Sequence, residues 1–309
     1  DRIDEFRKLL TSPDRIARRA FLPFLRVLVK TPRFRYSEKK GKRALEFKPR
    51  PICYASHFDA LVYSFYGFCL NEIYQEYVIR TGIENCVLAY RTDLNKCNID
   101  FAREVFDYIS KRGNCLAIAL DIKGFFDNID HSILKEKWKK VMGVPTLPLD
   151  HFRVFKSLTK FSYVNRNTLL KFQGINLKNC QPKPKVLLEP TVENFKEIRE
   201  RNLIVTNKMG KGIPQGSGMS AVLSNVYMID FDAFMMGLAE ANDMLYLRYC
   251  DDILIVCNQF NSERIIEKVY QEIENYGLEI QKKKEEKILF MKDPSGRLNS
   301  FNAKKLQQV

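Results

Sequence analysis

Three aspartates stand at the ends of otherwise apolar segments. Asp121 follows the run CLAIAL, and Asp251 and Asp252 lie between the segments YLRY and ILIV. Burying an ionised carboxylate is costly unless the group is paired or binds a metal. Carboxylates from neighbouring strands form the oxygen-rich type of site that suits Mg²⁺. Two such ions, about 4 Å apart, form a clamp for in-line phosphoryl transfer. Taken alone, Asp251 and Asp252 also fit an ordinary hairpin turn, and Asp121 also fits a helix-capping acid.

The elements that would position these aspartates follow from the pattern of apolar residues. The continuous apolar run at 115–122 predicts a buried central strand, and Lys123 and Gly124 then turn the chain. Two further strands, 244–249 and 253–256, would place Asp251 and Asp252 at a hairpin tip. Asp130 is expected to cap a helix that ends at Gly143. The helix capped by Asp130 would span residues 132–142. Helical spacing predicts further helices over residues 3–10, 14–30, 101–110, 221–238 and 262–276, and a mostly buried helix of more than about 15 residues within 51–78. Residues 31–44 fit a loop or hairpin tip, and residues 280–291 hold another strand.

The positive charge is concentrated near the N-terminus. The 309 residues carry a formal charge of +14, and the first fifty hold 16 basic and 6 acidic side chains. A balance of this kind favours a polyanionic partner, either nucleic acid or an acidic membrane surface. The eight cysteines contain no C-x-x-C pair and there are only three histidines, which argues against a zinc site. Cysteines in apolar runs favour a reducing, cytoplasmic compartment, and no apolar stretch reaches the length of a transmembrane helix.

Three motifs occur in a fixed order along the chain. They are ALDIKGFFDNIDH at 119–131, GIPQGSGMSAVLSN at 212–225 and YCDD at 249–252. This set resembles the motifs of bacterial reverse transcriptases related to retron and group II intron enzymes, and it looks most like the unknown-group relatives that are associated with phage defence. The resemblance implies an α+β right-hand polymerase with fingers and palm. The palm would be an antiparallel sheet with helices packed on one face, and the thumb would be reduced or absent.

The resemblance also implies roles at the palm. Asp121, Asp251 and Asp252 would be the catalytic metal ligands, with the carbonyl of Ile122 assisting. The cofactor would be two Mg²⁺ ions, with Mn²⁺ as a substitute. Phe126 would be a steric gate that favours dNTPs over NTPs, and a core aromatic is the alternative interpretation of this residue.

Further nucleotide contacts are implied from outside the aspartate motifs. Lys48 and Arg50 resemble the basic fingers strand that covers the triphosphate, since arginine suits bidentate phosphate contacts. Gln215 and Gly216 would lie against the incoming nucleotide, and glycine allows close backbone approach. Lys284 aligns with a lysine that can protonate pyrophosphate, although the neighbouring lysines leave this assignment open.

Contacts to the template and to a structured RNA are expected nearer the N-terminus. Tyr90 and Arg91 resemble a fingers motif that contacts the template. The basic N-terminal segment is expected to bind RNA through Arg33, Arg35, Lys39, Lys40, Lys42 and Arg43.

Motifs and composition together suggest a division of the chain. Residues after Met291 are too few for the usual helical thumb, so a bound RNA would take its place. The expected parts are a basic N-terminal helical extension (1–44), fingers (45–114), the first part of the palm (115–145), an insertion or fingers-side segment (146–207), the second part of the palm (208–291) and a short C-terminal remnant (292–309).

The expected function is RNA-directed DNA synthesis, which copies a dedicated noncoding RNA into cDNA in bacterial antiphage defence. The expected partners are that RNA, dNTPs and the cDNA product, with no membrane; the oligomeric state is left open. One alternative is a template-independent or protein-primed DNA-synthesising relative. A second is a catalytically idle RNA-binding protein on a polymerase fold, which the three intact aspartates argue against.

Overall fold

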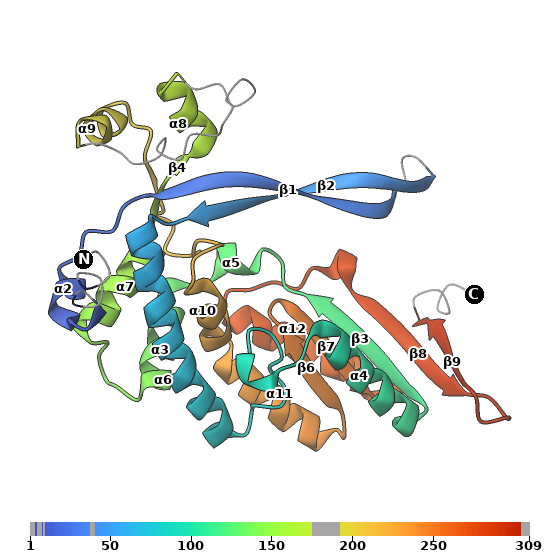
Figure 1. The fold of residues 1–309 in the computed structure, drawn as a ribbon. Helices are drawn as coiled ribbons and strands as arrows, with labels where there is room; N and C mark the ends of the chain where they lie inside the picture. The colour runs from blue at the N-terminus through green and yellow to red at the C-terminus, as the bar shows by residue number, and fades with distance from the viewer. Residues whose placement is uncertain (1–3, 5–7, 9, 38–40, 175–191, 304–309) are drawn as a thin grey trace. The chain divides into compact units, whose positions relative to one another are not determined.

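The computed structural model describes the chain except residues 1–3, 5–7, 9, 38–40, 175–191 and 304–309 (Figure 1). The chain divides into two compact units. Unit 1 comprises residues 1–68 and 147–220, and unit 2 comprises residues 69–146 and 221–309. Each unit contains one sheet with helices beside it, so the class is α+β.

The sheet of unit 1 has the strand order β2-β1-β4-β5. β1 (Phe24–Ser37) pairs with β2 (Lys42–Tyr54) in an antiparallel register along its whole length after Phe24. β1 pairs with β4 (Ser162–Asn165) only through Phe24–Arg26, and β4 then pairs with β5 (Val205–Thr206). From Val27 onward β1 and β2 therefore form a two-stranded ribbon, the long blue hairpin of Figure 1.

This ribbon corrects one sequence prediction and agrees in part with another. The helix predicted over 14–30 is limited to α2 (Pro13–Ala17). The loop or hairpin tip predicted over 31–44 falls at the far end of the β1–β2 hairpin, where the described residues are mostly strand. The apolar spacing near Val27 and Val29 fits a helix, but β-branched residues pack well in strands, and β2 supplies hydrogen-bonding partners that no local pattern reveals. The helix predicted over 3–10 lies mostly outside the described residues.

Helices of unit 1 surround the start of β1. They are α2, the first part of α3 (His57–Thr81), α7 (Leu149–Thr159), α8 (Arg166–Phe172) and α9 (Val192–Glu200). The described parts of 146–207 are thus largely helical, and most of the segment 174–190, where an extended loop with strand pieces is expected, lies outside the described residues. Asp59 on α3 is 1% exposed and accepts hydrogen bonds from Arg19 Nε (2.9 Å) and the Leu22 amide (3.0 Å). These bonds fix the path of the chain between α2 and β1.

The sheet of unit 2 has five antiparallel strands in the order β6-β7-β3-β8-β9. Three of its strands were predicted from the sequence, since β3 spans Cys115–Asp121, β6 spans Leu245–Tyr249 and β7 spans Asp252–Cys257. The predicted strand over 280–291 is interrupted by the 3₁₀ turn η4 (Lys282–Lys284), after which β8 (Glu286–Lys292) begins. The predicted C-terminal remnant supplies the edge strand β9 (Leu298–Asn302).

The two faces of this sheet differ. Leu116, Ile118 and Leu120 on one face of β3 are at most 3% exposed. On the other face, Ile109 of α4 packs with Cys115 at the start of β3, whereas Ala119 and Asp121 remain accessible. The sheet therefore has one buried face and one face that opens toward the end of β3.

Helices of unit 2 include α4 (Asn98–Arg112), α5 (Phe125–Asn128), α6 (His131–Met142), α11 (Ile229–Ala241) and α12 (Ser262–Asn275), with the remainder of α3. Asp130 caps α6 as predicted, accepting from the amides of Ser132 and Ile133, and Gly143 ends it with φ +66°. The single helix predicted over 221–238 is instead a pair, α10 (Ser220–Tyr227) and α11, bent by 49°. Within the described ranges, no helix alone has the length and apolarity needed to cross a membrane.

Candidate active site

Two of the three predicted metal ligands are cross-strand neighbours. The antiparallel register of β3 and β7 places Asp121 opposite Asp252, on the open face of the sheet. Asp251 precedes Asp252 in the β6–β7 turn, and its carbonyl accepts a 3.0 Å hydrogen bond from the Ile122 amide. Like charges directly opposite each other destabilise an antiparallel pair. This corner of the sheet therefore requires a cation.

Lys284 supplies that cation in this structure. Its ammonium pairs with both carboxylate oxygens of Asp121, at 2.7 Å from Oδ2. The η4 turn places it there, because the Gln281 amide donates to the Asp121 carbonyl at 2.7 Å. Lys282 instead lies 5.3 Å from the ring centre of Tyr270. Of the lysines in this run, Lys284 is the one that reaches the aspartates.

The donor set suits a hard divalent cation, but the side chains are not gathered around one. In the described part of the chain, no three His, Cys, Asp or Glu residues form a group that could hold a metal ion. Asp121 faces Lys284, and a metal at this carboxylate would have to displace the ammonium. Two backbone hydrogen bonds flank the β-bridge between Ile122 and Ile280, and the Ile122 carbonyl is an acceptor in neither of them. Three carboxylates and this carbonyl are all oxygen donors, which fits Mg²⁺, and the ligand set stays a prediction.

A buried guanidinium holds the turn that carries Asp251. Arg248 is 0% exposed and donates from Nε and Nη2 to the two oxygens of Asp232, at 2.8 and 2.6 Å. Its Nη1 donates to the Cys250 carbonyl and to Asn225 Oδ1, each at 3.2 Å. Cys250 has φ +59°, a left-handed conformation that non-glycine residues rarely adopt. Arg248 thus connects the turn to α10 and α11 at Cys250, the residue of this turn with a left-handed backbone.

This network was missed by sequence reasoning, although a signal was present. Asp232 lies in the apolar helix that reads FDAFMMGL, and Arg248 lies in the apolar strand before YCDD. Opposite charges within two buried segments indicate an ion pair, because neither charge is tolerated alone. Tyr246 extends the pair by donating to Asp232 Oδ1 at 2.7 Å. Burial also raises the pKa of the nearby Cys250 thiol to about 11, so this cysteine stays protonated at neutral pH.

Phe125 and Phe126 lie in different environments. Gly124, with φ +55°, turns the chain into α5 directly after the Asp121 strand. Phe125 is 2% exposed and packs against Tyr227, with ring centres 6.4 Å apart. Phe126 is half-buried and lies 5.5 Å from Phe125. Phe125 is thus the core aromatic, which leaves Phe126 exposed enough for the predicted gate.

Four predicted nucleotide contacts belong to unit 1 and share one neighbourhood. Lys48 and Arg50 lie on β2, where Arg50 Nη1 donates to Thr31 Oγ1 at 3.1 Å. Further along β2, the Cys53 amide donates to the Gln215 carbonyl at 2.8 Å. The loop that carries Gln215 and Gly216 therefore lies against the same strand as the two basic residues.

Gly216 meets two separate constraints. Its φ is +103°, and a Cβ at this position would lie 2.8 Å from Ile52 Cγ2 and 3.0 Å from the Cys53 carbonyl oxygen. Gly210 in the same loop has φ +70° but nothing within 4 Å of such a Cβ. Comparing alanine substitutions at the two glycines therefore separates the effect of backbone strain from the effect of close packing.

We expect Gly216→Ala to destabilise the protein more than Gly210→Ala. The control should cost about 1 kcal/mol for the left-handed backbone. Gly216→Ala should add roughly 1–3 kcal/mol of overpacking against β2. Urea unfolding measures both; equal losses would show that the loop and β2 do not pack closely.

The structure corrects the prediction for Arg91. This side chain is buried, with Nε and Nη2 bonded to Asp93 at 2.8 and 2.6 Å, and Nη1 bonded to the Glu84 carbonyl at 2.9 Å. Its guanidinium holds the chain before α4 and is not presented to a template. Tyr90 is 45% exposed, so it keeps an accessible ring, although its hydroxyl lies 3.5 Å from Cys250 Sγ.

Four of the six residues predicted to bind a structured RNA lie on the ribbon, whose two faces differ. Strand alternation places Arg33 and Lys42 on the same face as Lys48 and Arg50, and Arg43 on the opposite face. That opposite face also carries the exposed apolar residues Leu28, Phe34, Tyr36, Leu45 and Phe47. Arg35 lies in β1, and Lys39 and Lys40 are outside the described residues.

Comparison with known proteins gives one family match. Residues 69–305 match the family model described as reverse transcriptase (RNA-dependent DNA polymerase). The structure is similar to that of telomerase from Candida albicans in complex with a fragment of telomeric RNA, at 14% identity and a TM-score of 0.46, over 89% of this chain and 44% of that one. For a C-terminally truncated apo telomerase from Candida tropicalis, the identity is 10% and the TM-score 0.43, over 91% and 55%. The chain thus spans about half the length of these structures, and no curated protein sequence matches it.

Proposed function

Because the chain belongs to the reverse transcriptase family and has its right-hand polymerase fold, we propose that it is an RNA-directed DNA polymerase whose reaction takes place at Asp121, Asp251 and Asp252. One observation carries this proposal. Within the matched region, the strand register sets Asp121 opposite Asp252 on an open sheet face, beside Asp251. Reverse transcriptase domains use divalent metal ions, and we propose two Mg²⁺ ions here, with Mn²⁺ as a substitute.

Several side chains of this protein would have separate roles in the reaction. When bound, the metal ions supply Lewis acidity at the primer hydroxyl and the leaving pyrophosphate. Lys284, displaced from Asp121, would donate a proton to the pyrophosphate. Phe126 would exclude a 2′-hydroxyl. Lys48 and Arg50 would hold the triphosphate against the loop that carries Gln215.

The decisive experiment is to supply the purified protein with a defined RNA template, a DNA primer and dNTPs, and to sequence the product. A product complementary to the RNA is the expected result. DNA of unrelated sequence would instead favour a template-independent enzyme, and DNA joined to the protein would favour protein priming. Binding of RNA without any synthesis would favour a catalytically idle protein.

We further propose that the template is a dedicated structured noncoding RNA, and that the system acts in the cytoplasm of a bacterium in defence against phages. The motif resemblance supports this proposal. RNA that copurifies with the protein should match the cDNA made by the complex. Cells that carry the wild-type protein should survive phage infection better than cells in which Asp251 and Asp252 are both alanine.

Lys284→Ala should lower the rate of dNTP incorporation by roughly tenfold to a thousandfold, the range of a lost general acid. It should also lower the Mg²⁺ concentration needed for half-maximal activity, because no ammonium then competes for Asp121. Lys283→Ala is the matched control, since Lys283 is exposed on the same turn. If both variants behave alike in steady-state assays, the lysine run is only a solvated surface.

Lys42→Ala combined with Arg43→Ala should weaken RNA binding and reduce the slope of log K against log salt by about 1.4, the value for two contacts to single-stranded phosphates. Both side chains are exposed near the tip of the ribbon. Removal of residues 1–44 would be a poor test, because it deletes the central strand β1. Arg103→Ala with Lys111→Ala on α4 is the control of equal charge. An unchanged slope in the ribbon variant would exclude this segment from RNA binding.

A further inference from the structure

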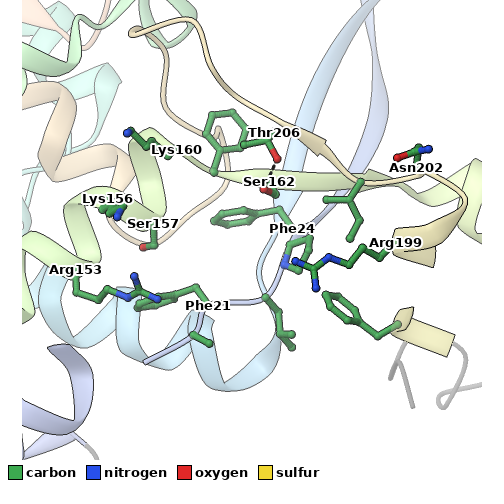
Figure 2. A pocket seen from close by; sticks show the side chains of 16 residues that line it. Phe21, Phe24, Arg153, Lys156, Ser157, Lys160, Ser162, Arg199, Asn202 and Thr206 are labelled. Atoms are coloured by element: carbon green, nitrogen blue, oxygen red, sulfur yellow. Dashed lines mark hydrogen bonds between the residues drawn. The ribbon is translucent and has the colours of Figure 1, made fainter. Parts of the chain in front are cut away.

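Unit 1 contains a pocket separate from every residue assigned to the polymerase reaction. It encloses about 600 Å³ (Figure 2). Its walls come from the segment between α2 and β1, the C-terminal half of α7, the start of β4, and α9 with the chain that follows it. The part contributed by residues 20–24 precedes the region that matches the family model.

The pocket is lined by four cations and by no acidic residue. Arg153, Lys156 and Lys160 are spaced along one face of α7 and its C-cap, and Arg199 comes from α9 across the pocket. Arg153 is held in place because its Nε donates to the Arg19 carbonyl at 2.6 Å. No carboxylate of the described residues pairs with Lys156, Lys160 or Arg199. Four cations around one cavity repel one another, so their placement favours an anionic ligand.

The rest of the lining is aromatic and hydroxyl-bearing. Phe21, Phe161 and Phe195 are half-buried and contribute ring surface to the pocket. Phe21 is fixed by stacking on Tyr63, with ring centres 5.2 Å apart. Ser162 and Thr206 share a 2.8 Å hydrogen bond at the β4–β5 pair. Preformed rings beside cations suit a ligand that has both a planar ring and a negative charge.

We propose that this pocket binds a nucleotide, with its phosphate among the α7 and α9 cations and its base among the phenylalanines. The volume of this cavity lies within the range of small-ligand sites. It is larger than a bare phosphate needs. The nucleotide is either free or one residue of a single-stranded RNA that enters the pocket. This inference does not depend on the proposed polymerase activity, because the pocket shares no residue with that site.

The test compares two double charge reversals in the full chain. Lys156→Glu with Lys160→Glu changes the pocket. Lys196→Glu with Lys208→Glu is the control, because these two lysines are exposed in unit 1 and do not line the pocket. Binding of a fluorescein-labelled oligouridylate and of ATP is measured in EDTA, which removes metal-dependent binding at the aspartates. Urea unfolding checks that both variants remain folded.

The pocket reversal should weaken oligouridylate binding at least about fivefold more than the control reversal, because it removes local phosphate contacts as well as net charge. A parallel loss of ATP binding identifies a site for free nucleotides, and a loss for RNA alone identifies a site for a nucleotide within a strand. Phe195→Ala should weaken the same ligand, while Phe195→Tyr retains it. Equal losses in the pocket and control variants would overturn the proposal, whether or not the protein synthesises DNA.

Discussion

Replacing Asp251 and Asp252 together by alanine should reduce dNTP incorporation by at least about a thousandfold. The double variant removes two of the three carboxylates expected to hold the metal ions that activate the attacking hydroxyl and stabilise the leaving group. Primer extension on a defined RNA template, measured with radiolabelled dNTP, gives the rate. Removing the charge opposite Asp121 also relieves cross-strand repulsion, so urea stability should stay the same or rise.

The control for this double variant is Asp107→Ala, which removes an exposed carboxylate on α4. Its incorporation rate should match that of the wild type. RNA affinity should not fall in either variant, because carboxylates repel phosphate and contribute no attraction to RNA. Substantial incorporation by the double variant would contradict the assignment of the site.

Replacing Arg248 by methionine should destabilise the protein by about 3–5 kcal/mol, the usual cost of leaving one partner of a buried ion pair unpaired. Asp232 would remain fully buried, with only the Tyr246 hydroxyl and uncharged neighbours to satisfy it. Urea unfolding measures the loss. Arg112→Ala is the comparison, because its partner Asp243 is 93% exposed and surface pairs contribute about 1 kcal/mol or less.

A second variant separates stability from positioning. Arg248→Met combined with Asp232→Leu removes both charges and should recover much of the stability, since apolar replacements of buried ion pairs are often neutral. The Cys250 carbonyl still loses its guanidinium partner, so the turn before Asp251 should be less well fixed. We expect incorporation to remain roughly tenfold to a hundredfold below wild type. Full activity in this stable double variant would show that Arg248 serves stability alone.

Sequence patterns predicted the core of unit 2 better than the ribbon of unit 1. The continuous apolar run that ends at Asp121 has few alternatives to a buried strand, and the cap at Asp130 depends only on neighbouring residues. β1 is different, because its hydrogen-bonding partner β2 turns back only after Ser37. Its apolar positions fit two periodicities, and the choice between them depends on a tertiary pairing that no window of sequence contains.

Prediction of the candidate site from the sequence was limited in the same way. Residue types and motif order identified the aspartates, but only the register shows that Asp121 faces Asp252 rather than another strand residue. Three lysines near Lys284 (Lys282, Lys283 and Lys287) are equivalent to it in sequence, and the η4 turn distinguishes Lys284 from them. The resemblance of Tyr90 and Arg91 to a fingers motif suggested a template contact, but a motif does not show that the Arg91 guanidinium pairs with Asp93, two residues away.

The exposed edges of the ribbon are possible sites of self-association. Beyond β4, no other strand among the described residues pairs with either edge of the ribbon, and the side chain of Phe34 is 70% exposed on its apolar face. Such an edge is a template for aggregation. Pro32, Pro49 and Pro51 interrupt it, because each lacks an amide proton and cannot donate to an added strand. These prolines, together with the charges between them, should keep an exposed β-hairpin from nucleating intermolecular sheets.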